Sequence, residues 1–223
     1  YAPFSSILRG FILPKFFLEN CGAYLAAIRS IGRTEEYFYM PVFESAAMIP
    51  PQTRREALTE VRAQLDTVSG SILNIRGGGN DLSHAFGLRR PANPTIYDLR
   101  PVADILIDIV AAFGTQYVVS GPVWEYYSGE GWEEGLRREM ELDLLNGFTG
   151  KTVIHPNQIP VVNEMLRVSQ RDYADARAIL NWDTGSGSLV SASEDGGRMN
   201  EYNTHSRWAR RIVLRAERYG VRA

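Results

Sequence analysis

The chain has 223 residues with a formal charge of -2 and a pI near 6.0, and 44% of its residues are hydrophobic. This length and balance predict one soluble globular domain with a substantial core, and the near-neutral charge excludes a generally basic surface for nucleic acid or membranes. Cys21 is the only cysteine, which excludes an intrachain disulfide, and no run approaches the roughly 20 apolar residues of a membrane span. We therefore expect a cytoplasmic protein with no nucleic acid or membrane partner.

The first half of the chain predicts strands that alternate with helices, because short apolar or β-branched runs are followed by segments with helical spacing. The expected strand and helix pairs are 11–15 and 18–31, 37–43 and 53–65, 71–75 and 102–113, and 116–120 and 132–145. A glycine-rich loop over 76–82 follows the third strand.

The stretch 147–159 predicts a fifth strand over 152–154, which Pro156 ends because proline cannot continue a ladder. A helix over 160–181, a Gly/Ser-rich loop over 184–200 and a helix over 206–218 are expected next. Alternating strands and helices predict a parallel sheet covered on both faces. The pattern alone leaves open whether this sheet is complete or belongs to an eight-stranded barrel.

Two carboxylates follow predicted strands. Glu44 comes directly after the second strand, and Asp81 follows the third after 37 further residues, one strand-helix step. Carboxylates at neighbouring strand ends can share a hard cation such as Mg²⁺. The alternative is that Glu44 is a turn residue and Asp81 a helix cap.

Three further features invite a functional reading. The backbone of Gly77, Gly78 and Gly79 could approach an anion closely, although a flexible turn explains the same run. Lys15 follows the first strand and is either a Schiff-base lysine, a cation for an anionic substrate or an ion-pair partner. His155 could transfer protons near neutral pH or hydrogen-bond its own loop. Lys15 and Lys151 are the only lysines, which makes both worth testing.

Taken together, Leu13-Pro14-Lys15, Phe43-Glu44-Ser45, 78–82 and 147–159 resemble the citrate lyase β-subunit-like, HpcH/HpaI-type aldolase family in order and separation. The resemblance implies a TIM (β/α)₈ barrel and an Mg²⁺-dependent carbon–carbon lyase with Glu44 and Asp81 as metal ligands. It also implies that the family's first three strands, with a substrate-contacting arginine on the third, would precede Gly10. We therefore expect one partial barrel domain over 1–223, with C-terminal helices and the Gly/Ser-rich loop in 160–223.

The function implied by this resemblance is cleavage of a keto acid or its acyl-CoA adduct through a metal-stabilised enolate. In this reading Glu44 and Asp81 bind Mg²⁺, the backbone at 77–79 lies near the substrate carboxylate, and Lys15 and His155 support catalysis. The alternatives are a Schiff-base aldolase that uses Lys15 and a non-catalytic binding or assembly subunit. Family members are commonly oligomeric, so a homo-oligomer is expected. Asn80 stands where the family commonly has an acidic residue, which suggests a divergent branch.

Overall fold

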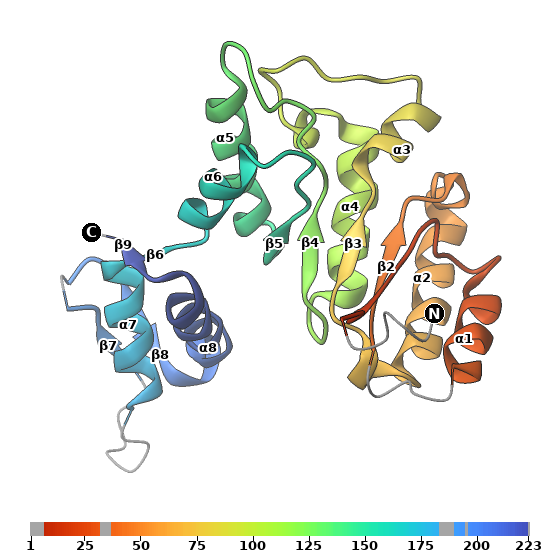
Figure 1. The fold of residues 1–223 in the computed structure, drawn as a ribbon. Helices are drawn as coiled ribbons and strands as arrows, with labels where there is room; N and C mark the ends of the chain where they lie inside the picture. Colours follow the sequence, from red (N-terminus) through yellow and green to blue (C-terminus); the bar gives the residue numbers. More distant parts are fainter. Residues whose placement is uncertain (1–6, 32–36, 183–189, 195, 223) are drawn as a thin grey trace. The chain divides into compact units, whose positions relative to one another are not determined.

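The computed structural model describes residues 7–31, 37–182, 190–194 and 196–222. The chain divides into two compact units, Tyr1–Ile159 and Pro160–Ala223, shown as ribbons in Figure 1. The expected single domain over 1–223 stays a prediction. No helix in the described ranges is long and apolar enough to cross a bilayer.

The first unit contains a five-stranded parallel sheet in which each strand pairs with the next one along the chain. The strands are β1 (Gly10–Leu13), β2 (Phe38–Phe43), β3 (Ile75–Gly77), β4 (Val119–Gly121) and β5 (Gly150–Lys151), in the order β1-β2-β3-β4-β5. The helices of this unit are α1 (Cys21–Ser30), α2 (Pro51–Asp66), α3 (Gly79–Ala85), α4 (Arg100–Phe113) and α5 (Trp132–Leu145). The expected α/β fold with a parallel sheet is therefore confirmed.

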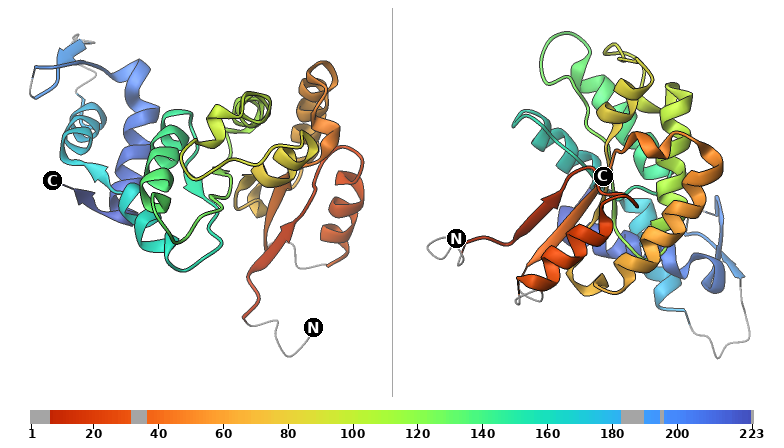
Figure 2. Two further views of the ribbon diagram at one scale, coloured as in Figure 1. Left: turned by 90° about the horizontal axis from the view of Figure 1, so that it is seen from above. Right: turned by 90° about the vertical axis from the view of Figure 1, so that its right-hand side faces the viewer.

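The core of the first unit lies between the sheet and its helices. Phe43 of β2 and Ile75 of β3 are fully buried with Leu65 of α2 and Leu106 of α4. The right-hand view of Figure 2 shows α1, α2 and α4 on one side of β1 and β2. The opposite face, called the open face below, carries exposed Ile12 and Phe38. The expectation of helices on both faces is thus not met among the described residues, because apolar side chains of α1, α2 and α4 pack on one face.

Three short 3₁₀ turns complete the first unit, at Ala46–Met48, Ser69–Ser71 and Ile96–Asp98. One of them corrects the sequence analysis: 69–71 forms a turn, so the third strand begins at Ile75 instead of Ser71. The glycine run is not a loop either. Gly77 ends β3 and Gly79 begins α3, and the missing Cβ at Gly77 leaves room for Leu106 of α4. The fifth strand likewise lies at 150–151, before the expected 152–154.

The second unit is smaller and is built around two helices. Its elements are α6 (Gln158–Met165, which begins in the first unit), β6 (Val168–Ser169), α7 (Gln170–Leu180), β7 (Val190–Ala192), β8 (Met199–Glu201), α8 (Tyr202–Tyr219) and β9 (Val221–Arg222). Its core contains Val168, Ile179 and Ile212. β6 pairs with β9 in parallel, and β7 pairs with β8 in antiparallel.

Two expectations for this unit are wrong. The single helix over 160–181 is interrupted at 166–169, because β6 pairs with β9 and the Ser169 hydroxyl caps α7 by accepting a hydrogen bond from the Asp172 N–H. The expected loop over 184–200 contains the hairpin of β7 and β8, while 183–189 and 195 lie outside the described residues.

Candidate functional site

Three of the predicted site residues lie together at the carboxyl ends of neighbouring strands. Lys15 follows β1, Glu44 directly follows β2, and Asp81 lies in the first turn of α3, after β3. The backbone N–H of Lys15 donates a hydrogen bond to Glu44 Oε1 (3.0 Å), and Lys15 Nζ lies 2.9 Å from Asp81 Oδ1. The parallel register of β1, β2 and β3 brings these ends together, as the sequence analysis assumed.

Lys15 adopts a backbone conformation that is unusual for a residue with a Cβ, with φ at 51°. Its surroundings hold that conformation. The Asn20 side chain donates to the Lys15 carbonyl (2.7 Å) and accepts from the Phe17 N–H (3.0 Å), and the Tyr24 hydroxyl donates to the Pro14 carbonyl (2.9 Å). Strained residues of this kind cluster at functional sites, because the neighbouring structure must stabilise them for a reason other than local preference.

The Glu44 side chain packs directly against the backbone of Gly78. A Cβ at Gly78 would overlap Cβ and Oε2 of Glu44, and the Gly78 N–H donates to the Phe43 carbonyl (3.0 Å). The neighbouring glycines permit other close contacts, Gly77 with Leu106 and Gly79 with Pro122. The glycine run therefore packs α3 and Glu44 closely against the sheet. Its contact with a substrate carboxylate stays a prediction.

The electrostatics of Glu44 agree with a cation site. Burial raises the pKa of Glu44 and the negative charge of Asp81 raises it further, while the hydrogen bond from the Lys15 N–H lowers it. The hydrogen bond from Lys15 to Asp81, and the negative charge of Asp81, raise the pKa of Lys15. The carboxylates of Glu44 and Asp81 lie beside one ammonium group and form an oxygen donor set suited to a hard cation.

These residues fit the predicted Mg²⁺ in number as well as in kind. Mg²⁺ is commonly held by one or two carboxylates and keeps its other positions for water and substrate oxygens. The described residues contain no group of three or more His, Cys, Asp or Glu side chains able to enclose a metal. Two carboxylates alone would leave the remaining positions of a bound Mg²⁺ to water or a ligand. Metal binding by these two residues stays a prediction.

His155 makes its contacts elsewhere in the loop after β5. Its ring stacks on Tyr127 with centroids 4.2 Å apart, and its Nδ1 accepts a hydrogen bond from the Asn157 N–H (3.2 Å). Within the described part of the chain, none of its contacts involves Lys15, Glu44 or Asp81. Its catalytic role stays a prediction.

Lys151, the second lysine, points toward the helices instead of the open face. Its Nζ lies 2.6 Å from Glu139 Oε1 and 2.8 Å from Asp143 Oδ2, and Arg90 Nη1 lies 2.7 Å from Glu139 Oε2. We call these four residues the buried charge cluster, since each side chain is at most 2% exposed. The buried charge cluster joins α5 to β5 and to the segment before α4, so its contacts stabilise the fold.

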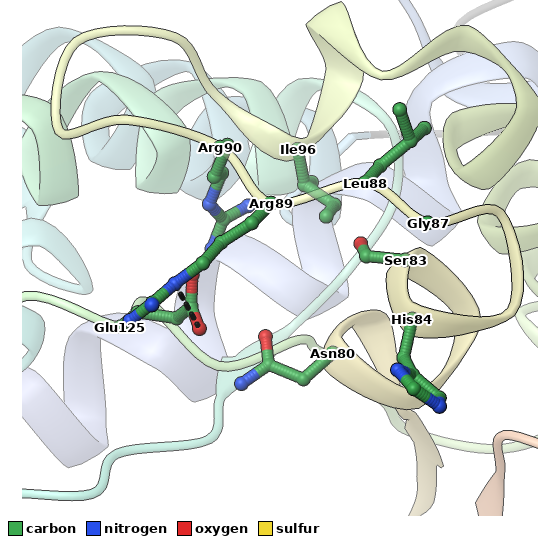
Figure 3. Close-up of a pocket in the computed structure, with 9 residues that line it drawn as sticks. All are labelled: Asn80, Ser83, His84, Gly87, Leu88, Arg89, Arg90, Ile96 and Glu125. Carbon is green, nitrogen blue, oxygen red and sulfur yellow. Dashed lines mark ion pairs between the residues drawn. The ribbon is translucent and has the colours of Figure 1, made fainter.

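A cavity of about 340 Å³ lies beside α3 (Figure 3). Asn80, Ser83 and His84 of α3 line it together with Arg89 and Glu125, whose charged atoms are 4.0 Å apart. Lys15, Glu44 and Asp81 are not among its lining residues. The cavity is thus separate from the carboxylate pair, although both use α3.

Arg76, which was not predicted from the sequence as a site residue, lies at the same end of the sheet. Arg76 is half-buried in β3, and its Nη2 donates to Thr152 Oγ1 (3.2 Å). Burial lowers the pKa of Arg76, and the charge of Glu44 raises it. The signal that could have found Arg76 is the two-residue period of a strand, which places it opposite buried Ile75. The predicted strand ends at Ile75, one residue before Arg76, so the prediction does not include Arg76 in the alternation.

The chain was compared with known proteins. A family model described as a C–C bond lyase of the TIM-barrel fold matches residues 2–221. An L-malyl-CoA/β-methylmalyl-CoA lyase from Cereibacter sphaeroides is 38% identical over 74 residues, which are 32% of this chain and 22% of the relative. The matched stretch thus spans about a fifth of that relative's length.

Two solved structures resemble the chain in fold. The first is CitE from Mycobacterium tuberculosis in complex with magnesium, acetoacetate and coenzyme A, with a TM-score of 0.59 and 20% identity. That match covers 92% of this chain and 77% of CitE. The second is a citrate lyase from Burkholderia xenovorans LB400, with a TM-score of 0.68 and 16% identity over 96% of this chain and 65% of that chain.

Proposed function

This chain belongs to the carbon–carbon bond lyase family of the TIM-barrel fold, and from that premise we propose that it is an Mg²⁺-dependent lyase or aldolase. Its substrate would be a keto acid or the acyl-CoA adduct of one. The observation that carries the proposal is the pair formed by Glu44 and Asp81, held together at the strand ends by Lys15. CitE, which has a similar fold, was solved with magnesium and acetoacetate, and this supports the proposal of a metal ion and a keto acid.

Glu44 and Asp81 would hold the metal. The chemistry that Mg²⁺ supplies when bound is stabilisation of the negative charge on an enolate oxygen, the charge that develops when a carbon–carbon bond next to a carbonyl is cleaved. The protein's own contribution is the placement of its carboxylates. Gly78 leaves room for Glu44, the Lys15 N–H fixes one Glu44 oxygen, and the Lys15 ammonium fixes Asp81.

Lys15 would also attract an anionic substrate to the strand ends, since its side chain is 66% exposed. His155 is a candidate for proton transfer through Nε2, because its Nδ1 already accepts from the Asn157 N–H and the ring proton therefore belongs on Nε2. Both roles are part of the proposal.

The Schiff-base alternative is less well supported. A nucleophilic lysine must be neutral, which requires a lowered pKa. The contact with Asp81 instead raises the pKa of Lys15, and the side chain is exposed to solvent. The ammonium form is therefore favoured, and a role for Lys15 as a cation agrees better with its surroundings.

The proposed chemistry can be tested without knowing the second substrate. We would follow exchange of the pyruvate methyl protons with deuterium in D₂O by NMR, because loss of such a proton produces the enolate. Exchange should require Mg²⁺, stop when EDTA is added and fall by at least about 100-fold in Glu44→Gln, which keeps the size of the side chain but removes its charge. Exchange that persists in EDTA, together with borohydride trapping at Lys15, would favour the Schiff-base route. No exchange in the parent protein alongside metal-dependent pyruvate binding would favour the binding-subunit reading.

A further inference from the structure

We propose that Arg76 binds a carboxylate group of the substrate at the site formed by Glu44 and Asp81. The inference rests on the proposed function and deepens it, because it names the side chain that recognises the acid group of the keto acid.

The position of Arg76 follows from the alternation of β3. Ile75 is fully buried in the core, and a Cβ at Gly77 would contact Leu106 of α4, so both neighbours of Arg76 face the helices. The Arg76 side chain therefore lies on the open face. In the register of the sheet Arg76 is between Val42 of β2 and Ser120 of β4. Glu44 follows Val42 by two residues, which places it at the same end of the sheet.

No carboxylate of the described residues forms an ion pair with the Arg76 guanidinium. The two fully buried arginines of the described residues are paired: Arg54 lies 2.7 Å from Asp108, and Arg90 lies 2.7 Å from Glu139. Among the described residues, Arg76 forms no ion pair, and its hydrogen bond goes to the neutral hydroxyl of Thr152. An anion stabilises a guanidinium that is partly removed from water. Its planar donors fit a carboxylate by two parallel hydrogen bonds, an arrangement that a ligand can complete.

The charges of the site also favour an anionic ligand once a divalent cation is bound. Lys15 and Arg76 contribute two positive charges, and Glu44 and Asp81 contribute two negative charges, so the four residues sum to zero. A bound Mg²⁺ brings the total to +2, which attracts a carboxylate. The hydrogen bond to Thr152 holds the Arg76 guanidinium on the open face.

The test compares Arg76→Met with the parent protein, using the full chain and calorimetry. Arg76→Met removes a positive charge, so Mg²⁺ should bind as well as in the parent or more tightly. At saturating Mg²⁺, the Kd of pyruvate should rise about 10- to 100-fold, while the Kd of pyruvamide, which lacks the carboxylate, should change less than about threefold. Unchanged or tighter metal binding together with weaker acid binding is a pattern that misfolding does not produce.

Two further variants keep the inference falsifiable if Arg76→Met folds poorly. Arg76→Lys keeps the charge without the planar fork and should show an intermediate loss for pyruvate, and Thr152→Val should weaken pyruvate binding several-fold. Arg89→Met serves as the matched control, since Arg89 is exposed and lines the separate cavity. It should leave both affinities unchanged.

The outcomes separate this inference from the proposed function. Unchanged pyruvate affinity in Arg76→Met, or equal losses for pyruvate and pyruvamide, would overturn the role of Arg76 and leave the metal site intact. A parent protein that binds Mg²⁺ but no pyruvate would overturn the proposed function, and the inference with it.

Discussion

Gly78 matters at the scale of single residues because it decides where Glu44 can lie. Its φ is -94°, which any residue adopts, so the need for glycine is steric: a Cβ would overlap the Glu44 side chain. The glycine run was singled out from the sequence for a possible approach to substrate. In the structure its clearest effect is on a neighbouring carboxylate.

We expect Gly78→Ala to displace Glu44, weaken Mg²⁺ binding at least about tenfold and lower the free energy of unfolding by about 1–3 kcal/mol through overpacking. Titration calorimetry and urea unfolding measure both effects. Gly70→Ala is the matched control, because a Cβ at Gly70 would meet nothing within 4 Å. It should change stability by less than about 0.5 kcal/mol. If Gly78→Ala binds Mg²⁺ like the parent, Glu44 is not a ligand in this position.

Part of the candidate site could be predicted from the sequence, from residues that follow the ends of predicted strands. Glu44 and Asp81 were expected to meet because parallel strands end at one edge of a sheet, and the structure brings both into contact with Lys15. Arg76 was missed because the third strand was placed too early. The left-handed backbone of Lys15 could not be read from the sequence either, since Asn20 imposes it through contacts that no periodicity reveals.

Among the helices and strands, the buried charge cluster connects α5, β5 and the segment before α4. Lys151 of β5 contacts Glu139 and Asp143 of α5, and Glu139 also accepts from the Ile96 N–H (2.7 Å) at the start of the 3₁₀ turn before α4. Burial raises the pKa of Asp143, while the charge of Lys151 lowers it. Removing one member would leave a buried charge without compensation.

Lys151→Met should therefore lower the free energy of unfolding by about 3–5 kcal/mol, measured by urea unfolding. Lys15→Met provides the comparison, because the Lys15 and Asp81 side chains are 66% and 44% exposed and their pair is screened by water. We expect the loss for Lys15→Met to be much smaller. Similar losses in the two variants would mean that the buried charge cluster does not stabilise the junction of α5 and β5.

A buried tyrosine links α2 to the segment before β4. The Tyr117 hydroxyl donates to Asp66 Oδ1, and burial, followed by this hydrogen bond and the Asp66 charge, raises the pKa of Tyr117. Below the ordinary tyrosine pKa of about 10, both folded and unfolded states keep the proton and the contribution to stability is complete. Above it the unfolded state loses the proton first, so stability falls as pH rises.

The parent protein should consequently lose stability more steeply than Tyr117→Phe between about pH 10 and 11, by up to about 1.4 kcal/mol per pH unit. Urea unfolding of both proteins at several pH values measures the difference in slope. Parallel curves for parent and variant would show that Tyr117 ionises alike in the folded and unfolded states.

Element positions were predictable where local signals were strong. The helix expected over 132–145 coincides with α5, and the one over 102–113 differs from α4 by two residues at its start. The errors lie where tertiary pairing decides. β5 is set by the pairing of Gly150 with Ser120 and of Lys151 with Gly121, and the helix expected over 160–181 is broken by the pairing of β6 with β9. Periodicity within one segment contains no information about such partners.

At the scale of the whole molecule, the order of the strands resolves what the sequence left open. A doubly wound sheet reverses its strand order at a switch point, whereas a barrel wall adds each strand beside the previous one. The order β1-β2-β3-β4-β5, with α1, α2 and α4 on one face, is that of a barrel wall, and the family model names the same fold. In a closed barrel of this fold the open face would be the interior side, and Arg76 and Thr152 meet on that face.

The most direct test of the account is a calorimetric titration of the full chain with Mg²⁺, with and without pyruvate, oxaloacetate or glyoxylate, repeated on Glu44→Gln and Asp81→Ala. We predict that the parent binds Mg²⁺, that a keto acid binds only when the metal is present, and that both variants lose metal and keto acid binding while remaining folded. Parent protein that binds no Mg²⁺, or variants that bind it with unchanged affinity, would contradict the assignment of Glu44 and Asp81 as the centre of the site.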